Sequence, residues 1–147
     1  MNKYRVAPLK MSHLADLRDT CREAEFAIPL LSADVLKHST GLTLLCDRKP
    51  IACGGILSPS SGLGVTWLFT VGATDAREGT TILRHILSGF RRLAREGKYR
   101  RIEALVLEDF AIARRVVEIL GFEYCCTKDL YGPQGQTFYE YVWRAPK

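Results

Sequence analysis

The chain alternates between short apolar runs and polar loops, and the period of each run predicts its secondary structure. YRVAP at 4–8 alternates and ends at a proline, which predicts a short edge strand. The apolar runs 43–47 and 51–57 flank a polar turn of hairpin length, Asp47 to Pro50, and therefore predict a β-hairpin. After them, SPSSGLG at 58–64 has the composition of a loop.

Helical spacing predicts two helices before that hairpin. Ser12 is a plausible N-cap for the first, in which Leu14, Leu17 and Cys21 recur at helical intervals. The second is expected from Ser32 to about His38, with Gly41 ending it.

The second half of the chain predicts two strand and helix units. VTWLFTV at 65–71 is a strand, and a long amphipathic helix begins near Thr80 and stops at Gly97. Its apolar stripe consists of Ile82, Leu83, Ile86, Leu87, Phe90, Leu93 and Ala94. A buried strand at 102–107 then leads to a helix that Asp109 caps and that ends through a left-handed residue at Gly121.

FEYCCTK at 122–128 and TFYEYVW at 137–143 are two β-type runs around the turn YGPQGQ, so the chain closes with an antiparallel hairpin. The whole order predicts an α/β (α+β) fold with a mixed, mostly antiparallel sheet of about six or seven strands and helices on both faces. At 147 residues the chain is expected to form a single domain, 1–147.

The composition is that of an ordinary globular protein, with 47% hydrophobic and 25% charged residues. No apolar run approaches the roughly 20 residues that span a bilayer. The N-terminal stretch carries charges and lacks a long apolar core, so we expect no secretory signal and a cytoplasmic location.

Five cysteines form an odd set without C-x-x-C spacing, and three histidines are scattered along the chain. Most of the cysteines lie in apolar runs, where a thiol packs as a small hydrophobic group. We therefore expect reduced core cysteines and no metal site.

The net charge of +5 is unevenly spread. Between Arg84 and Arg101 there are seven Lys or Arg residues and one acid, Glu96. This segment is either the solvated face of an amphipathic helix or a surface for a polyanion, and nucleic-acid binding through 84–101 is the less favoured alternative.

Several segments together resemble the GNAT fold of the acetyl-CoA-dependent N-acetyltransferases. They are the hairpin with IACGGI, the strand WLFTV, the long helix after Gly79, and the helix ending in LGF at 120–122. The resemblance covers nearly the whole chain and implies an acetyl-CoA site between the strand at 65–71 and the strand at 102–107.

The family's phosphate loop, R/Q-x-x-G-x-G/A, is only partly present. In the best register Gly79 matches, whereas Ala76 stands at the Arg or Gln position and Thr81 at the last small position. Two acids, Asp75 and Glu78, lie beside this loop and would repel a pyrophosphate.

The second family signature is a helix whose tyrosine commonly acts as general acid toward the departing thiolate. The resemblance places Val117 at that position, and valine cannot transfer a proton, so we expect no catalytic residue of this kind unless Tyr124 or another residue replaces it. Glu103 and Glu108 are candidate bases but are interpreted more simply as exposed carboxylates.

A closer resemblance is to degenerate GNAT-like proteins of tailed bacteriophages, including internal virion proteins. The segments that carry it are KPIACGG, VTWLFT, EGKYRRIEALV and YGPQGQTFYEYVWR. It implies a catalytically inactive virion or morphogenesis protein in the particle and the host cytoplasm, with no cofactor, that binds other virion proteins or its own copies. Candidate contact surfaces are the basic helix and the aromatic strand with Phe138, Tyr139, Tyr141 and Trp143, although plain alternation between core and surface explains that strand equally well.

The alternative is an acetyl-CoA-dependent N-acyltransferase that acts on an amine. A slot beside Phe69 to Val71 would then hold the pantetheine arm of acetyl-CoA, and Gly79, Thr80 and Thr81 would donate some backbone N–H groups to the cofactor. Catalysis would rest on positioning.

Overall fold

The computed structural model describes residues 3–18, 39–70 and 75–147 of the chain. Seven strands in these residues form one sheet in the order β1-β2-β3-β4-β5-β7-β6. The strands are β1 (Tyr4–Pro8), β2 (Ser39–Cys46), β3 (Lys49–Ser60), β4 (Leu63–Thr70), β5 (Arg101–Leu107), β6 (Glu123–Lys128) and β7 (Phe138–Arg144). Within this sheet β4 and β5 run parallel and the other neighbours run antiparallel, which confirms the expected mixed fold class.

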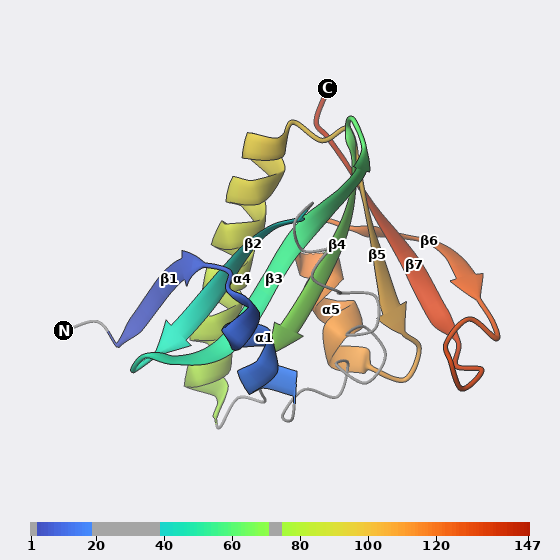
Figure 1. The fold of residues 1–147 in the computed structure, drawn as a ribbon. Helices are drawn as coiled ribbons and strands as arrows, with labels where there is room; N and C mark the ends of the chain where they lie inside the picture. The colour runs from blue at the N-terminus through green and yellow to red at the C-terminus, as the bar shows by residue number, and fades with distance from the viewer. Residues whose placement is uncertain (1–2, 19–38, 71–74) are drawn as a thin grey trace.

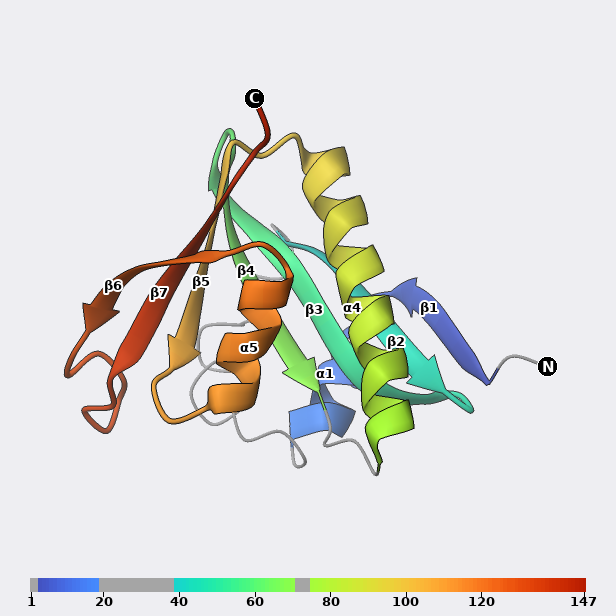
Figure 2. The ribbon, with the colours of Figure 1, turned by 180° about the vertical axis from the view of Figure 1, so that it is seen from behind.

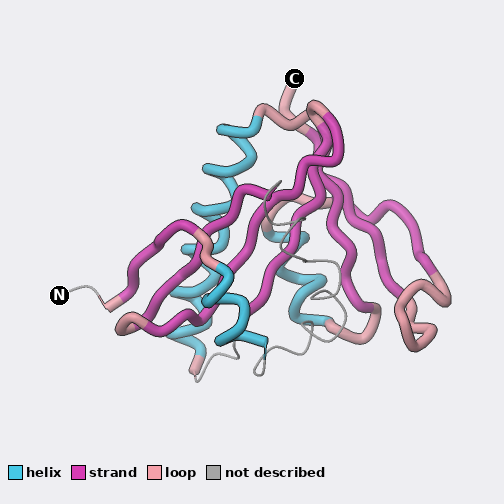
Figure 3. The backbone as a smooth tube through the Cα atoms, viewed as in Figure 1, coloured by secondary structure: helices cyan, strands magenta, loops and turns pink. Residues whose placement is uncertain are grey.

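The described helices are α1 (Met11–Arg18), α4 (Ala76–Gly97) and α5 (Ala111–Ile119). The helices α4 and α5 lie side by side on one face of the sheet, and α1 covers part of the other face (Figure 1, Figure 2). The tube view in Figure 3 shows the same sheet between the two helical layers. The expectation of helices on both faces is therefore confirmed.

The main core lies between the sheet and the two helices α4 and α5. The predicted stripe of α4 faces it, with Ile82, Phe90, Leu93 and Ala94 buried. The ring of Phe90 lies 5.3 Å from that of Phe122 and meets Trp143 edge to face at 5.9 Å. These contacts hold α4 against the end of α5 and against β7.

The first hairpin forms as predicted, through Asp47 and Arg48, whose φ angles of 49° and 70° suit the tight turns that join twisted strands. The predicted loop at 58–64 is wrong in extent. β3 runs to Ser60 and β4 starts at Leu63, so only Ser61 and Gly62 turn, with Gly62 at a φ of 79°. Strand pairing thus overrides the turn-like composition of this segment.

Two predicted helix N-caps are wrong. Ser12 lies inside α1, which begins at Met11, and the ring of His13 instead accepts the backbone N–H of Lys10 at 3.1 Å. Asp109 is not the N-cap of α5, because Phe110 takes that position without a side-chain cap hydrogen bond. The predicted stop of the long helix at Gly97 is confirmed, and the left-handed residue that follows it is Lys98, at a φ of 53°.

Gly121 has the predicted left-handed conformation, with a φ of 99°. Gly41 does not end a helix but lies within β2, where an added Cβ would come within 2.7 Å of the Leu9 side chain. The predicted helix from Ser32 to His38 and the cysteine at Cys21 fall outside the described residues.

Candidate functional site

The strands β4 and β5 are paired at one end and part at the other. Their register joins four positions, from Leu63 with Arg101 to Thr66 with Ala104, and the pairing stops there although β4 continues to Thr70. Figure 1 shows the two strands diverging toward their C-terminal ends. The backbone of β4 after Thr66 therefore presents a strand edge that β5 does not cover.

Hydrogen bonds around one glycine hold the paired end closed. The carbonyl of Gly62 accepts the backbone N–H of Arg100 at 2.8 Å and that of Arg101 at 3.2 Å. Beside it the buried Tyr99 hydroxyl lies 2.6 Å from the Ser58 hydroxyl. The strands are thus fixed together at one end, and the divergence forms toward the other.

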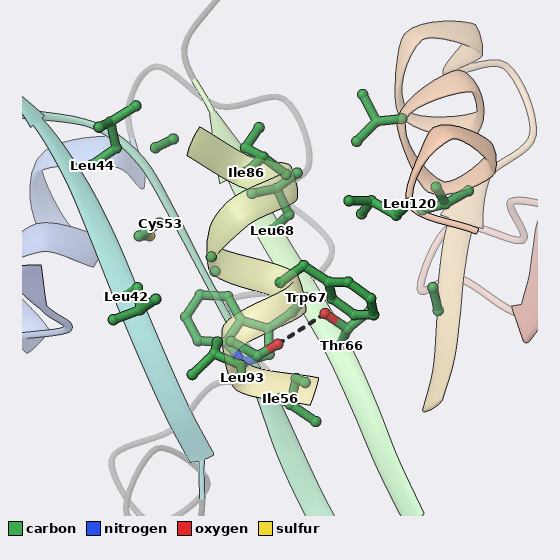
Figure 4. Close-up of a pocket in the computed structure, with 18 of the residues that line it drawn as sticks. Leu42, Leu44, Cys53, Ile56, Thr66, Trp67, Leu68, Ile86, Leu93 and Leu120 are labelled. Atoms are coloured by element: carbon green, nitrogen blue, oxygen red, sulfur yellow. Dashed lines mark hydrogen bonds between the residues drawn. The ribbon is translucent and has the colours of Figure 1, made fainter. Parts of the chain in front are cut away.

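An apolar cavity of about 130 Å³ lies under α4 and α5 at this divergence. Its walls come from five strands and from the helices α4 and α5. They include Leu42, Ile56, Thr66, Trp67, Leu68, Leu105, Ile86, Phe90, Ala113, Val116 and Leu120. Figure 4 shows Leu120 of α5 across the gap from Ile86 of α4 and Leu68 of β4. Such a cavity fits a slender, mainly apolar chain.

The polar groups of this region are largely used within the fold. The Thr66 hydroxyl donates to the Gly55 carbonyl at 3.0 Å, as the dashed line in Figure 4 shows. The indole N–H of Trp67 donates to the Ser39 hydroxyl at 3.1 Å. Because these groups already have partners, they fix the wall of the cavity in place.

Asp75 caps the N-terminus of α4. Its carboxylate accepts the backbone N–H of Glu78 at 2.8 Å, and its carbonyl accepts that of Gly79 at 3.1 Å. The helix thus begins at Ala76, four residues before the predicted start near Thr80. An aspartate followed three positions later by a glutamate is a capping signal that the sequence already contained.

The predicted phosphate-binding residues therefore lie inside the helix. Gly79, Thr80 and Thr81 all belong to α4. The hydroxyls of Thr80 and Thr81 donate to the carbonyls of Ala76 and Arg77, at 3.0 and 3.1 Å. With the Asp75 carboxylate on the first turn, this part of α4 fits a pyrophosphate poorly. Val71, the fourth predicted contact, lies outside the described residues.

Val117 is a buried residue of the main core and also lines the cavity. Tyr124, the suggested replacement for the family's tyrosine, lies on the edge strand β6 and is 56% exposed. Its ring packs edge to face on Tyr139 and Tyr141, and its hydroxyl lies 2.5 Å from that of Thr127. It is not among the residues that line the cavity, so this position does not support a role at the reacting atoms.

The two candidate bases occupy different places. Glu103 lies in the middle of β5, 3.8 Å from the guanidinium of Arg101. Glu108 follows the end of β5 and is exposed, and its carbonyl accepts a hydrogen bond from Arg114 at 3.1 Å. Neither carboxylate is among the groups that line the cavity.

The basic residues of α4 are exposed, in agreement with a solvated face. Arg77, Arg84, Arg91 and Arg95 recur at intervals of seven, seven and four residues and so form one stripe that points away from the sheet. Nucleic-acid binding through 84–101 remains an untested prediction.

The aromatic side chains of β7 alternate between the core and the opposite face of the sheet, as expected for a strand that is not a contact surface. Tyr141 is buried in the main core, and Tyr139 and Trp143 pack against this core. Phe138 is one position out of step with these three residues, so its side chain faces the other side of the sheet. Three of the four rings thus serve the core, which weakens the case for an aromatic contact surface.

The expectation of core cysteines is wrong for three of the four that the structure describes. Cys53 is buried, Cys46 and Cys126 are partly exposed, and Cys125 is exposed. The sequence placed Cys125 and Cys126 in an apolar run but could not show that this run is an edge strand.

Comparison with solved structures identifies the fold as that of the GNAT acetyltransferases. A GNAT family acetyltransferase from Elizabethkingia anophelis, with acetyl-CoA bound, superposes with a TM-score of 0.69 at 9% sequence identity, covering 99% of this chain and 100% of that one. The ribosomal-protein-S18-alanine N-acetyltransferase from Escherichia coli gives a TM-score of 0.71 at 13% identity, with coverage of 98% and 95%. The ribosomal-protein-S5-alanine acetyltransferase from Vibrio fischeri gives 0.71 at 10%, with coverage of 98% and 94%.

Searches against protein-family models and against curated protein sequences found no match. At such low identities the structural likeness establishes the fold and no more. It gives no support to the expected relation with phage virion proteins. In the described part of the chain, no helix is long and apolar enough to cross a membrane.

Proposed function

We propose that this protein is an acyltransferase that binds a pantetheine thioester such as acetyl-CoA and transfers the acyl group to an amine. The observation that carries the proposal is the apolar cavity where β4 and β5 part after four paired positions. The likeness to an acetyltransferase with acetyl-CoA bound, over almost the full length of both chains, supports the same assignment.

The site suits one part of acetyl-CoA, the pantetheine arm, better than another part, the pyrophosphate. The cavity walls and the edge of β4 beyond Thr66, with which β5 does not pair, suit the pantetheine arm. An extended amide chain can pair with a strand edge while its methylenes lie on apolar side chains. The first turn of α4 is less suitable for the pyrophosphate, because Asp75 already caps it with a negative charge. The proposal therefore assigns most of the donor's binding energy to the pantetheine arm.

In the transfer step the amine nitrogen attacks the thioester carbonyl, a carbon–nitrogen bond forms, and the carbon–sulfur bond breaks. The amine loses a proton and the departing sulfur gains one. Val117 cannot supply that proton. The cavity contributes by orientation, since it holds the thioester in a fixed position at the opening of the sheet.

The proposal is tested by measuring free thiol released from acetyl-CoA in the presence of a panel of amines, including small polyamines and peptides with free N-termini. We expect thiol release that requires both the protein and an amine, and a product heavier by one acetyl group. Acetyl-pantetheine, which lacks the nucleotide, is expected to serve as a donor with only a modest loss of rate.

The competing hypothesis is a non-catalytic scaffold in a phage particle. It is motivated by the capped α4 and by the valine at position 117, and it has no support from the structural neighbours. A folded protein that neither releases thiol nor binds acetyl-CoA or acetyl-pantetheine at millimolar concentration would favour it over the acyltransferase.

A further inference from the structure

We propose that Cys125, Cys126 and Glu140 form a binding site for a thiophilic divalent cation of the zinc class. The three residues lie on β6 and β7, and none of them lines the cavity at β4 and β5. The site is therefore independent of the proposed acyl transfer.

A β-bulge brings the two thiols together. Tyr124 is paired with Tyr141 and Cys126 with Glu140, so two steps along β6 correspond to one along β7 and Cys125 is the extra residue. In a regular strand adjacent side chains point to opposite faces. Here the bulge breaks that alternation, and the two sulfurs and a Glu140 carboxylate oxygen all lie within 4.8 Å of one another.

The distances suit a tetrahedral ion. The Cys126 Sγ lies 3.6 Å from the Glu140 Oε2. Zinc binds sulfur at about 2.3 Å and carboxylate oxygen at about 2.0–2.2 Å, so tetrahedral geometry places such ligands roughly 3.5 Å apart. Small side-chain rotations would bring all three groups onto one ion, and the exposure of Cys125 leaves a fourth position open to water.

The charges around Glu140 are compatible with a cation. Lys128 Nζ lies 3.6 Å from Oε1 and Arg101 lies 4.0 Å from Oε2, and Arg101 also contacts Glu103 at 3.8 Å. These are long ion pairs, so Oε1 can keep Lys128 while Oε2 binds the ion. The two thiolates, Glu140 and Glu103 carry four negative charges, which the divalent ion, Lys128 and Arg101 balance.

Binding must displace protons. Metal ions bind the thiolate and not the thiol, so binding releases protons and cation affinity increases with pH. A bound ion would join the bulge of β6 to β7 and stabilise this edge of the sheet.

The test is a titration of the full chain with Co²⁺ and Cd²⁺ under a phosphine reductant, followed through the thiolate-to-metal charge-transfer absorption. We expect one ion per chain, proton release on binding, and a melting temperature that rises with added Zn²⁺. Cys126→Ser and Glu140→Gln should each weaken binding by at least about tenfold. Cys46→Ser, a partly exposed cysteine on β2, is the matched control and should bind as the wild type does.

Either of two results would overturn the proposal. One is the lack of a charge-transfer band at an ion concentration tenfold above that of the folded protein. The other is equal affinity in the Cys125→Ser/Cys126→Ser double variant, which would place the ion elsewhere. Glu140→Gln keeps both thiols and the shape of the side chain, so it tests the site even where a cysteine variant folds poorly.

Discussion

The Asp75 carboxylate accepts the backbone N–H of Glu78 at 2.8 Å. The protein thus supplies its own anion to the first turn of α4, at a helix end where a phosphate would otherwise be favoured. This contact stabilises the start of α4. It also reduces the attraction of that helix end for a pyrophosphate, because a negative charge already lies there.

Removing that carboxylate should raise the affinity for acetyl-CoA. Asp75→Gly is expected to tighten binding by roughly two- to fivefold, which corresponds to about 0.3–1 kcal/mol for a charge at a helix N-terminus. Acetyl-pantetheine has no pyrophosphate, so its affinity should not change. Calorimetric titration with both compounds measures the difference, and Glu118→Ala, which removes an exposed acid from α5, is the control.

Two substitutions of Asp75 test its role as a helix cap. Asp75→Ala should lower the free energy of unfolding by about 1 kcal/mol, and Asp75→Gly by only a few tenths. Urea unfolding of the two variants distinguishes them. An unchanged stability in Asp75→Ala, or a gain in affinity that acetyl-pantetheine shares, would show that the cap does not act as described.

Two glycines should respond in opposite ways to alanine. At Gly89 in α4 the nearest atom to an added Cβ is Leu42 Cδ1 at 3.4 Å, so Gly89→Ala should stabilise the protein by about 0.5–1 kcal/mol through helix propensity. At Gly64 the added Cβ would lie 2.6 Å from Ile56 Cγ2, and overpacking there should cost about 1–3 kcal/mol. Urea unfolding measures the free energy of unfolding of both variants, provided that the m-value does not change. A Gly64→Ala variant as stable as the wild type would contradict the close packing of Gly64 against Ile56.

The left-handed residues at the helix ends predict a second pair of effects. Lys98 closes α4 at a φ of 53°, where a side chain is disfavoured, so Lys98→Gly should gain a few tenths to about 1 kcal/mol. Gly121 has a φ of 99°, and Gly121→Ala should lose about 1–2 kcal/mol. Thermal unfolding of the two variants should shift in opposite directions, and a shared direction would refute the assignment.

His13 should make stability depend on pH. Its Nδ1 accepts the Lys10 N–H and lies 2.7 Å from the hydroxyl of the buried Thr43. Burial lowers the pKa of His13, the charge of Lys10 lowers it further, and Asp16 opposes the shift. The unfolded chain therefore binds this proton more tightly, so stability is full above the ordinary value of about 6.5 and falls as the pH drops toward the folded pKa.

The check is urea unfolding of the wild type and His13→Asn between pH 5 and pH 8. The variant should show the flatter profile over the acidic half of that range, because its side chain does not titrate. Identical slopes in the two proteins would mean that His13 is not protonated on unfolding in this range.

Sequence periodicity was sufficient for the elements with strong patterns. The stripe around Phe90 on α4 and the hairpin around Asp47 were both predicted, because burial on one face imposes its period on the sequence. A cofactor site between the strands now seen as β4 and β5 was an expectation from the family resemblance alone. Pairing between strands far apart in the chain leaves no local signal in either of them.

The errors concern helix ends and the environment of single side chains. Asp75 was interpreted as a charge beside a phosphate loop, although its spacing from Glu78 is that of a cap. Cys125 and Cys126 were assigned to the core, since an edge strand with a bulge has the same apolar residues as a central one. Both depend on which neighbours the fold brings close, and that information is not in the local sequence.

The central claim is that the cavity at the divergence of β4 and β5 holds the pantetheine arm of an acyl donor. Calorimetric titration of acetyl-CoA into the wild type, Ala113→Leu and Ala111→Leu tests it most directly, because Ala113 lines the cavity and Ala111 is exposed on the same helix. We predict one acetyl-CoA per chain, a loss of at least about tenfold in Ala113→Leu, equivalent to about 1.4 kcal/mol, and no change in Ala111→Leu. Equal affinity in the folded Ala113→Leu variant, or no binding by the wild type at millimolar acetyl-CoA, would contradict the account.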